Sequence, residues 1–236
     1  MGTNDLAPLS AAEAYPLWAE HYDRETAVSS LENAAVEALT PRLAGRALLD
    51  AGCGTGRRLL HAAGAARVVG ADLVPAMLLA GRRNALAGVP AVGTDFRMLP
   101  FAAAVFDVIW CRLAIGHVAE IGPVYREFAR VAKPGACLII TDFHPDAARA
   151  GHQRTFRDAT GRLHAIEHYI HLPSDHERAA RDAGLTLEIR RDCAVGPAIR
   201  SFYERAGKLA AYEAQRGLPL VLALGFRLPS GNRLKC

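Results

Sequence analysis

One glycine loop constrains the fold of this chain more than any other stretch. Residues 50–56 read DAGCGTG, directly after the apolar residues 47–49 and before a segment rich in alanine, leucine and arginine. This order predicts a buried strand, a tight turn and the start of a helix. Because glycine lacks a Cβ and tolerates positive φ, such a turn lets a ligand lie directly against the backbone. The loop therefore predicts a nucleotide-like ligand at the end of a first strand.

Apolar segments alternate with helical ones after this loop. The apolar segments are mostly continuous, which is typical of parallel strands covered by helices on both faces. Apolar residues at helical spacing from about Ser10 to Leu43 predict helices before the first strand, with Tyr15, Trp18 and Tyr22 on one face. The sequence thus predicts an α/β fold with strands at residues 47–50, 67–72, 90–95, 106–111, 136–142, 185–190 and 218–228.

Composition excludes several classes of protein. Hydrophobic residues make up 51% of the 236 residues and charged residues 22%, as expected for a globular chain with one core. The net charge of +4 comes from scattered arginines, so we expect no nucleic-acid partner. No apolar run approaches the roughly 20 residues of a membrane helix, and the first residues lack the build of a signal peptide. The five cysteines are odd in number and form no C-x-x-C pair, so we expect a cytoplasmic protein without a disulfide framework.

Acidic residues stand at the ends of three successive expected strands. Asp50 ends the first, Asp72 the second, and Asp95 the third, where Phe96 follows. Asp72 lies about 20 positions beyond the glycine turn, a spacing suited to binding ribose hydroxyls. Asp95 can accept a hydrogen bond from an exocyclic amine while Phe96 offers an apolar wall to a purine. Any one of these acids alone also suits a turn or a helix cap.

The chain resembles the class I S-adenosylmethionine-dependent methyltransferases, of the small-molecule type found in quinone and natural-product biosynthesis. The resemblance rests on residues 50–56, on residues 70–78, on Thr94-Asp95-Phe96, and on the turn at residues 131–135. One departure is Ala136, where the family often has a second glycine. The resemblance implies a Rossmann-like, doubly wound, seven-stranded sheet that is mostly parallel with the last strand antiparallel.

The resemblance also implies where the cofactor S-adenosylmethionine binds. Residues 18–23 resemble the helical leader that closes over it. The expected cofactor contacts are Tyr22, Asp50, Gly52, Cys53, Gly54, Gly56, Asp72, Leu73, Met77, Asp95, Phe96 and Cys111.

Electrostatics favours the same ligand. The loop reads G-x-G-x-G instead of the dinucleotide fingerprint G-x-G-x-x-G. Asp50 beside the loop would repel a pyrophosphate, whereas it would attract the ammonium and sulfonium of S-adenosylmethionine. An NAD-dependent dehydrogenase and a non-enzymatic regulator that binds S-adenosylmethionine are the alternatives.

We expect one methyltransferase domain made of four parts. Residues 1–45 form a helical leader or lid, residues 46–142 the cofactor-binding core, residues 143–173 an insert with the acceptor pocket, and residues 174–236 the rest of the sheet. The expected reaction is in-line transfer of a methyl group to an oxygen or carbon of a small-molecule acceptor, which produces S-adenosylhomocysteine. The protein is expected to be a monomer or homodimer.

Histidines near the acceptor side are candidate catalytic residues. His117 follows the fourth strand and His144 the fifth, so either is placed to act as a general base. The alternative for each is a histidine that hydrogen-bonds loop backbone. Further histidines lie in and near the insert; they are His152, His164, His168, His171 and His176. On an expected strand His164 and His168 share a face while His171 points the other way, which is not a zinc-site spacing. We therefore expect no metal there and assign these histidines to the acceptor pocket or a solvated insert. The helix around Phe202 and Tyr203 is a second candidate for the acceptor pocket.

Overall fold

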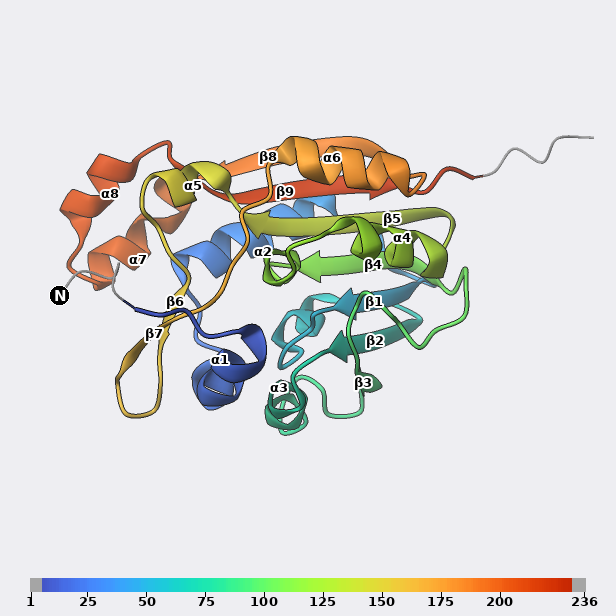
Figure 1. The fold of residues 1–236 in the computed structure, drawn as a ribbon, viewed down its shortest axis with the longest axis horizontal. Helices are drawn as coiled ribbons and strands as arrows, with labels where there is room; N and C mark the ends of the chain where they lie inside the picture. The colour runs from blue at the N-terminus through green and yellow to red at the C-terminus, as the bar shows by residue number, and fades with distance from the viewer. Residues whose placement is uncertain (1–5, 231–236) are drawn as a thin grey trace, which may run out of the picture.

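A seven-stranded sheet forms the centre of the computed structural model, which describes residues 6–230 (Figure 1). Every strand is parallel to its neighbours except β9, which is antiparallel to both β5 and β8. This confirms the predicted fold class. In spatial order the strands are β3 (Ala91–Gly93), β2 (Arg67–Asp72), β1 (Ala47–Ala51), β4 (Phe106–Arg112), β5 (Ala132–Phe143), β9 (Pro219–Arg227) and β8 (Thr186–Ala194).

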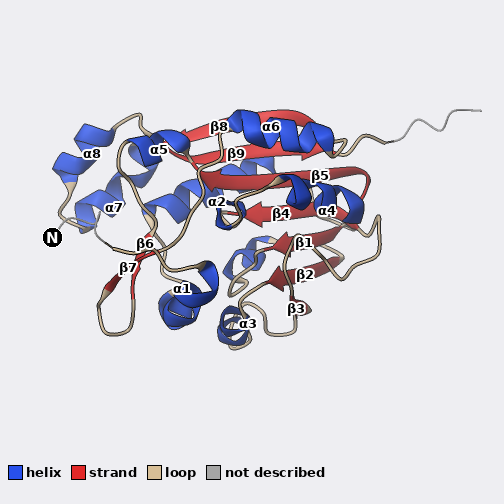
Figure 2. Cartoon of the chain, in the orientation of Figure 1, coloured by secondary structure: helices blue, strands red, loops and turns tan. Residues whose placement is uncertain are grey.

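Helices cover both faces of this sheet (Figure 2). On one face, α2 packs Val36 and Leu39 against Leu48 and Trp110. On the other face, α4 packs against β5, and α6 packs against β8 and against α4. Strand β1 is buried along its whole length, which explains its continuous apolar sequence. The helices are α1 (Ala11–Trp18), α2 (Ala27–Leu39), α3 (Pro75–Gly81), α4 (Gly122–Val131), α5 (Pro145–Arg149), α6 (Pro173–Asp182), α7 (Arg200–Arg205) and α8 (Leu209–Gln215), with 3-10 turns η2 (Ala19–His21), η3 (Arg57–His61), η4 (Ile115–His117) and η5 (Pro197–Ile199).

The sheet places a ligand site at the carboxyl ends of β1 and β4. The chain passes from β1 to β2 and β3 on one side and then returns to β4 on the other. Loops leaving β1 and β4 therefore diverge in opposite directions and open a crevice between them, which is where open α/β sheets bind ligands.

The helical leader and the insert meet above these strand ends. The insert forms a two-stranded antiparallel sheet from β6 (Thr155–Arg157) and β7 (Leu163–Ala165). The Leu9 N–H donates to the Ala165 carbonyl at 2.9 Å, and the Glu167 N–H donates to the Leu9 carbonyl at 2.7 Å. Figure 1 shows α1 beside β6 and β7 at the open end of the sheet. We call this combination of α1 and residues 150–171 the roof.

Two further features of residues 6–230 concern membrane-spanning helices and the cysteine thiols. Among residues 6–230, no helix is both long and apolar enough to cross a bilayer. Cys53, Cys111, Cys137 and Cys193 are free thiols, whereas Cys236 lies outside the described residues. The division of the chain at residues 45, 142 and 173 stays a prediction.

Candidate active site

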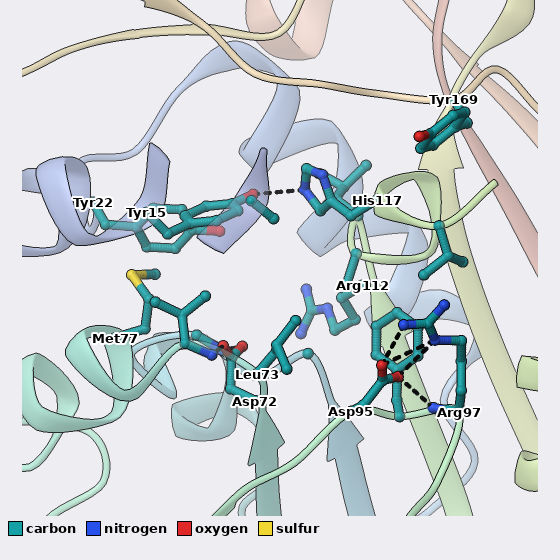
Figure 3. Close-up of a pocket in the computed structure, with 18 of the residues that line it drawn as sticks. Tyr15, Tyr22, Asp72, Leu73, Met77, Asp95, Arg97, Arg112, His117 and Tyr169 are labelled. Atoms are coloured by element: carbon teal, nitrogen blue, oxygen red, sulfur yellow. Dashed lines mark hydrogen bonds and ion pairs between the residues drawn. The ribbon is translucent and has the colours of Figure 1, made fainter. Parts of the chain in front are cut away.

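A cavity of about 290 Å³ opens at the carboxyl ends of β1, β2 and β4, beneath α1 (Figure 3). It brings together most of the residues that the sequence suggested for the cofactor. The predicted residues that line it are Tyr22, Gly52, Gly54, Asp72, Leu73, Met77, Asp95 and Phe96.

The glycine loop supplies bare backbone to this cavity. Gly52 has φ +80° and Gly54 has φ +58°, in the region that glycine adopts readily. A Cβ on Gly52 would lie only 2.5 Å from the Ala114 Cβ, and one on Gly54 would lie 3.1 Å from the Met77 methyl carbon. Side chains at these two positions would therefore fill the space where a ligand fits against the loop.

Asp72 is fixed beside the loop by two backbone donors. Its Oδ2 accepts from the Gly54 N–H at 2.7 Å, and its Oδ1 accepts from the Val74 N–H at 2.9 Å. Burial raises the pKa of this carboxyl, while the two N–H groups act in the opposite direction. Each oxygen keeps a lone pair, so the carboxylate can accept two further hydrogen bonds from adjacent ligand hydroxyls.

Asp95 and Phe96 form the next part of the wall. The Arg97 side chain donates to both Asp95 oxygens, with Nε at 2.9 Å from Oδ2. These hydrogen bonds hold the pKa of Asp95 below its ordinary value. The Phe96 ring packs edge-on against Phe128 at 6.1 Å between centroids, which fixes an apolar face at the cavity. The adenine-binding role of this pair stays a prediction, and Asp95 would share its carboxylate with Arg97.

Asp50 lies under the glycine loop and is fully buried. Neither of its oxygens has a hydrogen-bond partner within residues 6–230. Burial raises its pKa to about 6, although Arg112 and Arg58 act to lower it. Arg112 is neutralised by Glu32, which accepts from its Nε and Nη2 at 2.8 Å each. An unsatisfied buried carboxylate behind bare glycines fits a ligand that carries positive charge and no phosphate.

Besides Asp50, four predicted site residues do not line the cavity. Cys53 packs under Gly70, Gly56 contacts Leu86, and Cys111 is buried in the apolar core between the sheet and α4. His144 instead caps α5, because its Nδ1 accepts from the Asp146 N–H at 3.1 Å while its Nε2 lies 3.3 Å from Asp192. Its ring is thus held away from the cavity.

His117 lines the cavity together with a partner that the sequence did not single out. The Tyr15 hydroxyl lies 2.8 Å from His117 Nε2, and His117 Nδ1 lies 3.1 Å from the Glu167 carbonyl (Figure 3). Since a carbonyl only accepts, Nδ1 carries the proton, and Nε2 accepts from the tyrosine. Burial, assisted by Arg154 and His168, lowers the pKa of His117 to about 3. The imidazole is therefore neutral at physiological pH.

Tyr15 is similarly held in one protonation state. Burial raises its pKa to about 12, which keeps the hydroxyl protonated. The sequence placed Tyr15 on the apolar face of a helix with Trp18 and Tyr22, and that aromatic face packs over the cavity. Its pairing with His117, 102 residues away, had no local signal.

A second cavity of about 260 Å³ adjoins the first, and Tyr22 and Leu113 line both. Four arginines line it, and its described lining includes no acidic side chain; they are Arg24, Arg57, Arg58 and Arg154. Arg154 belongs to the insert and donates to the Leu113 carbonyl at 2.7 Å. Phe202 and Tyr203 line neither cavity and pack instead around Tyr212 in a separate apolar cluster.

Comparison with known proteins agrees with this geometry. Residues 49–140 match the model of a methyltransferase domain. A malonyl-[acyl-carrier protein] O-methyltransferase from Legionella pneumophila is 32% identical over 136 residues, which cover 56% of this chain and 45% of that protein. A demethylmenaquinone methyltransferase from Mycobacterium sp. is 32% identical over 157 residues, covering 63% of this chain and 66% of that protein. The chain thus spans about half to two thirds of the length of these relatives.

The fold is also similar to that of a solved methyltransferase. An S-adenosylmethionine-dependent methyltransferase from Mesorhizobium loti superimposes with a TM-score of 0.65 at 21% identity, covering 86% of this chain and all of that one. These matches favour a methyltransferase over a dehydrogenase or a regulator. The residues at the cavity fit S-adenosylmethionine, the cofactor of these proteins. The chain belongs to the class I S-adenosylmethionine-dependent methyltransferases.

Proposed function

We propose that this protein transfers a methyl group from S-adenosylmethionine to an oxygen or carbon of a small-molecule acceptor. The observation that carries the proposal is one cavity that joins a bare glycine loop, a fixed ribose-binding carboxylate and a neutral histidine. When bound, S-adenosylmethionine supplies an activated methyl group on a sulfonium. The chain's residues then have to hold donor and acceptor in line, which supplies on the order of 7–11 kcal/mol.

The proposed division of roles follows the cavity walls. Asp72 and the glycine loop bind the ribose and amino acid portions, and Asp95 with Phe96 holds the adenine. Leu73, Met77 and Tyr22 cover the ligand and exclude water. Asp50 acts through the loop by its negative field and makes no direct contact.

His117 is the proposed general base for an oxygen acceptor. Its Nε2 faces the cavity and is already a hydrogen-bond acceptor, so an acceptor hydroxyl can replace the Tyr15 hydroxyl there. Because the pKa of His117 is about 3, the proton passes to Nε2 as the bond to the methyl group forms and the acceptor oxygen becomes strongly acidic. Tyr15 would then reorient toward the acceptor or toward Arg154, whose Nη2 lies 3.3 Å away. His144 has no part in this step, because its ring nitrogens are occupied at the start of α5.

The acceptor is proposed to carry an acidic group. The second cavity continues from the side of Tyr22 and Leu113, and its arginines suit a carboxylate or phosphate. The names of the relatives mention a malonyl-acyl carrier protein and demethylmenaquinone, which differ from each other. We therefore base the acceptor class on the arginines of this chain. We further propose a cytoplasmic monomer or homodimer without a nucleic-acid partner, supported by the scattered charge and the free cysteines.

Titration calorimetry with S-adenosylhomocysteine tests the cofactor site. We expect binding to wild type and a loss of roughly 10-fold to 100-fold in Asp72→Ala, since hydrogen bonds to a charged group contribute about 1.5–3 kcal/mol. Glu213→Gln, on an exposed part of α8, is the matched control and should bind as wild type does. Equal binding by all three proteins would contradict the assignment.

Labelled methyl donor tests the acceptor class. Aromatic and aliphatic hydroxy acids are compared with their neutral amides, and we expect label in the acids only. Preferential labelling of the amides would overturn the acidic acceptor and leave the cofactor assignment intact.

A further inference from the structure

Four titratable side chains converge behind the wall that carries His117. Asp142 is the penultimate residue of β5, His168 and His171 lie in the segment before α6, and His176 lies within α6. All four side chains are at least nine-tenths buried. They come from parts of the chain that have no common spacing, which is why no sequence pattern predicted a metal site.

All three histidines of this cluster lie close to the Asp142 carboxylate. His171 Nδ1 is 3.2 Å and His176 Nε2 is 3.4 Å from Asp142 Oδ2. His168 Nε2 is 3.5 Å from the other oxygen, Oδ1. The ligand atoms of Asp142, His171 and His176 lie within 4.8 Å of one another. Ligands bound at 2.0–2.1 Å around a tetrahedral ion stand about 3.3 Å apart, so these separations suit a shared ion.

Within residues 6–230, hydrogen bonding leaves His176 Nε2 and both nitrogens of the His168 ring free, whereas His171 Nδ1 pairs with Asp142 Oδ2, the contact that an ion would replace. On the outer side, His176 Nδ1 lies 2.9 Å from the Tyr125 hydroxyl, and His171 Nε2 lies 3.3 Å from the Ala119 carbonyl. Metal-binding histidines are oriented in this way, by a partner on the nitrogen that does not touch the ion.

We propose that Asp142, His171 and His176 bind one divalent first-row transition-metal ion, with His168 beside the fourth position. Imidazole and carboxylate are the ligands that Zn²⁺ accepts in four-coordinate sites, so Zn²⁺ is the test ion. The ion also offsets the buried negative charge of Asp142, which neutral imidazoles alone do not.

The ion would fix the segments behind the active site relative to one another. It would join β5, the segment before α6, and α6 itself. That segment carries Tyr169, which lines the first cavity and whose N–H donates to the Gly116 carbonyl at 2.8 Å. The His168 ring packs edge-on against His117 at 5.8 Å between centroids, and a side chain at Gly116 would overlap it. The metal thus holds in place the loop that presents His117.

One further cavity approaches the cluster through His168. It has a volume of about 340 Å³, is lined also by His152 and Phe143, and shares no lining residue with the first cavity. It is the proposed entry for an ion, by way of His168. Because the ion would touch neither donor nor acceptor, this proposal stands or falls independently of the proposed function.

Metal content and thermal unfolding of the full chain test the site. Protein stripped with chelator and returned to Zn²⁺ should retain one ion per chain after dialysis and unfold at a higher temperature than the stripped form. Co²⁺ in place of Zn²⁺ should give the intense visible absorption of a four-coordinate, histidine-bound ion.

Variants separate this cluster from other histidines. Asp142→Asn and His176→Gln should lose the bound ion and the rise in unfolding temperature. His164→Gln is the matched control, because His164 pairs with Asp158 at 2.7 Å in the β6–β7 sheet, outside the cluster, and it should retain both. If either cluster variant fails to fold, the wild-type Co²⁺ spectrum decides. Wild-type protein without a stoichiometric ion, without a thermal shift and without that spectrum would overturn the proposal and leave a hydrogen-bonded cluster.

Discussion

The floor and the roof of the cavity are built in opposite ways. The floor, formed by the glycine loop and Asp72, is mainly backbone that is held locally, as in the bond from the Gly54 N–H to the Asp72 carboxylate. The roof brings Tyr15 from the leader to Arg154 of the insert and to His117 below, so side chains distant in sequence make its contacts. A floor of this kind suits a ligand that never changes, and a roof of this kind suits an acceptor that differs between relatives.

The largest expected effect concerns His117, the residue that the roof contacts from above. His117→Gln should lower kcat by roughly 10²–10⁴-fold for an oxygen acceptor, because it removes the general base. Affinity for S-adenosylhomocysteine should change little, since the proposed cofactor contacts lie in the floor. Steady-state kinetics and calorimetry on the same preparation make the comparison. An equal loss in both measurements would show that floor and roof do not act separately.

The next effect concerns Asp50 under the floor, which should make the free energy of unfolding depend on pH. The pKa of Asp50 is about 6 in the fold against 3.8 in its absence, so the unfolded chain releases this proton first as pH rises. Stability therefore falls between pH 4 and 6 by roughly 3 kcal/mol and stays lower above that range. Asp50→Asn should remove this fall, raising the free energy of unfolding of the ligand-free protein at pH 8 and weakening cofactor binding.

Urea unfolding at pH 4 and pH 8 checks this prediction, with Asp182→Asn, an exposed aspartate of α6, as the control. The prediction would be contradicted if, between pH 4 and pH 8, the free energy of unfolding of wild type fell no further than that of Asp50→Asn.

A smaller effect isolates the close approach of the floor to its ligand. Gly52 and Gly64 have φ of +80° and +85°, so alanine at either position carries the same backbone strain, about 1–3 kcal/mol. Only at Gly52 does the new Cβ meet another atom, the Ala114 Cβ at 2.5 Å, whereas none lies within 4 Å at Gly64. Gly52→Ala should therefore weaken S-adenosylhomocysteine binding by about 10-fold or more, and Gly64→Ala should not. Equal affinities of the two variants by calorimetry would show that the ligand does not approach the backbone closely at Gly52.

The smallest expected effect is on the pKa of His117, which lies beneath the roof. Burial is the main cause of the low pKa of His117, about 3, and Arg154 adds to it. In wild type the ring should show no NMR titration between pH 5 and 8. Arg154→Met should raise the pKa of His117, whereas Arg157→Met, an exposed arginine bonded to the Gly161 carbonyl, should leave it unchanged. A His117 titration centred near 6.5 in wild type would contradict the buried, neutral base.

The sequence predicted the floor far better than the roof. Asp72 was placed by its distance from the glycine loop, and both belong to one strand-loop-strand unit whose geometry is local. Cys111 was misplaced with them, because its side chain points into the core while that of its neighbour Arg112 reaches the cavity. Tyr15 was seen only as part of an apolar face, since its contact with His117 depends on how the leader crosses the sheet.

The histidines show the same limit. Periodicity along an expected strand put His164 and His168 on one face, but β7 ends at Ala165 and the two rings separate. His164 pairs with Asp158, while His168 turns toward Asp142, whose own position was read only as the end of a strand. Contacts of this kind are set by tertiary packing, which no spacing in the sequence records.

The hydrogen bonds between Leu9 and residues 165 and 167 have a consequence for how molecules enter and leave. They clamp the leader to the insert, so neither can lift alone without breaking a pair of backbone bonds. The amides of Leu9 and Glu167 should accordingly exchange with solvent at one shared rate. A single opening event then exposes both cavities together, so that spent donor and methylated product share one exit.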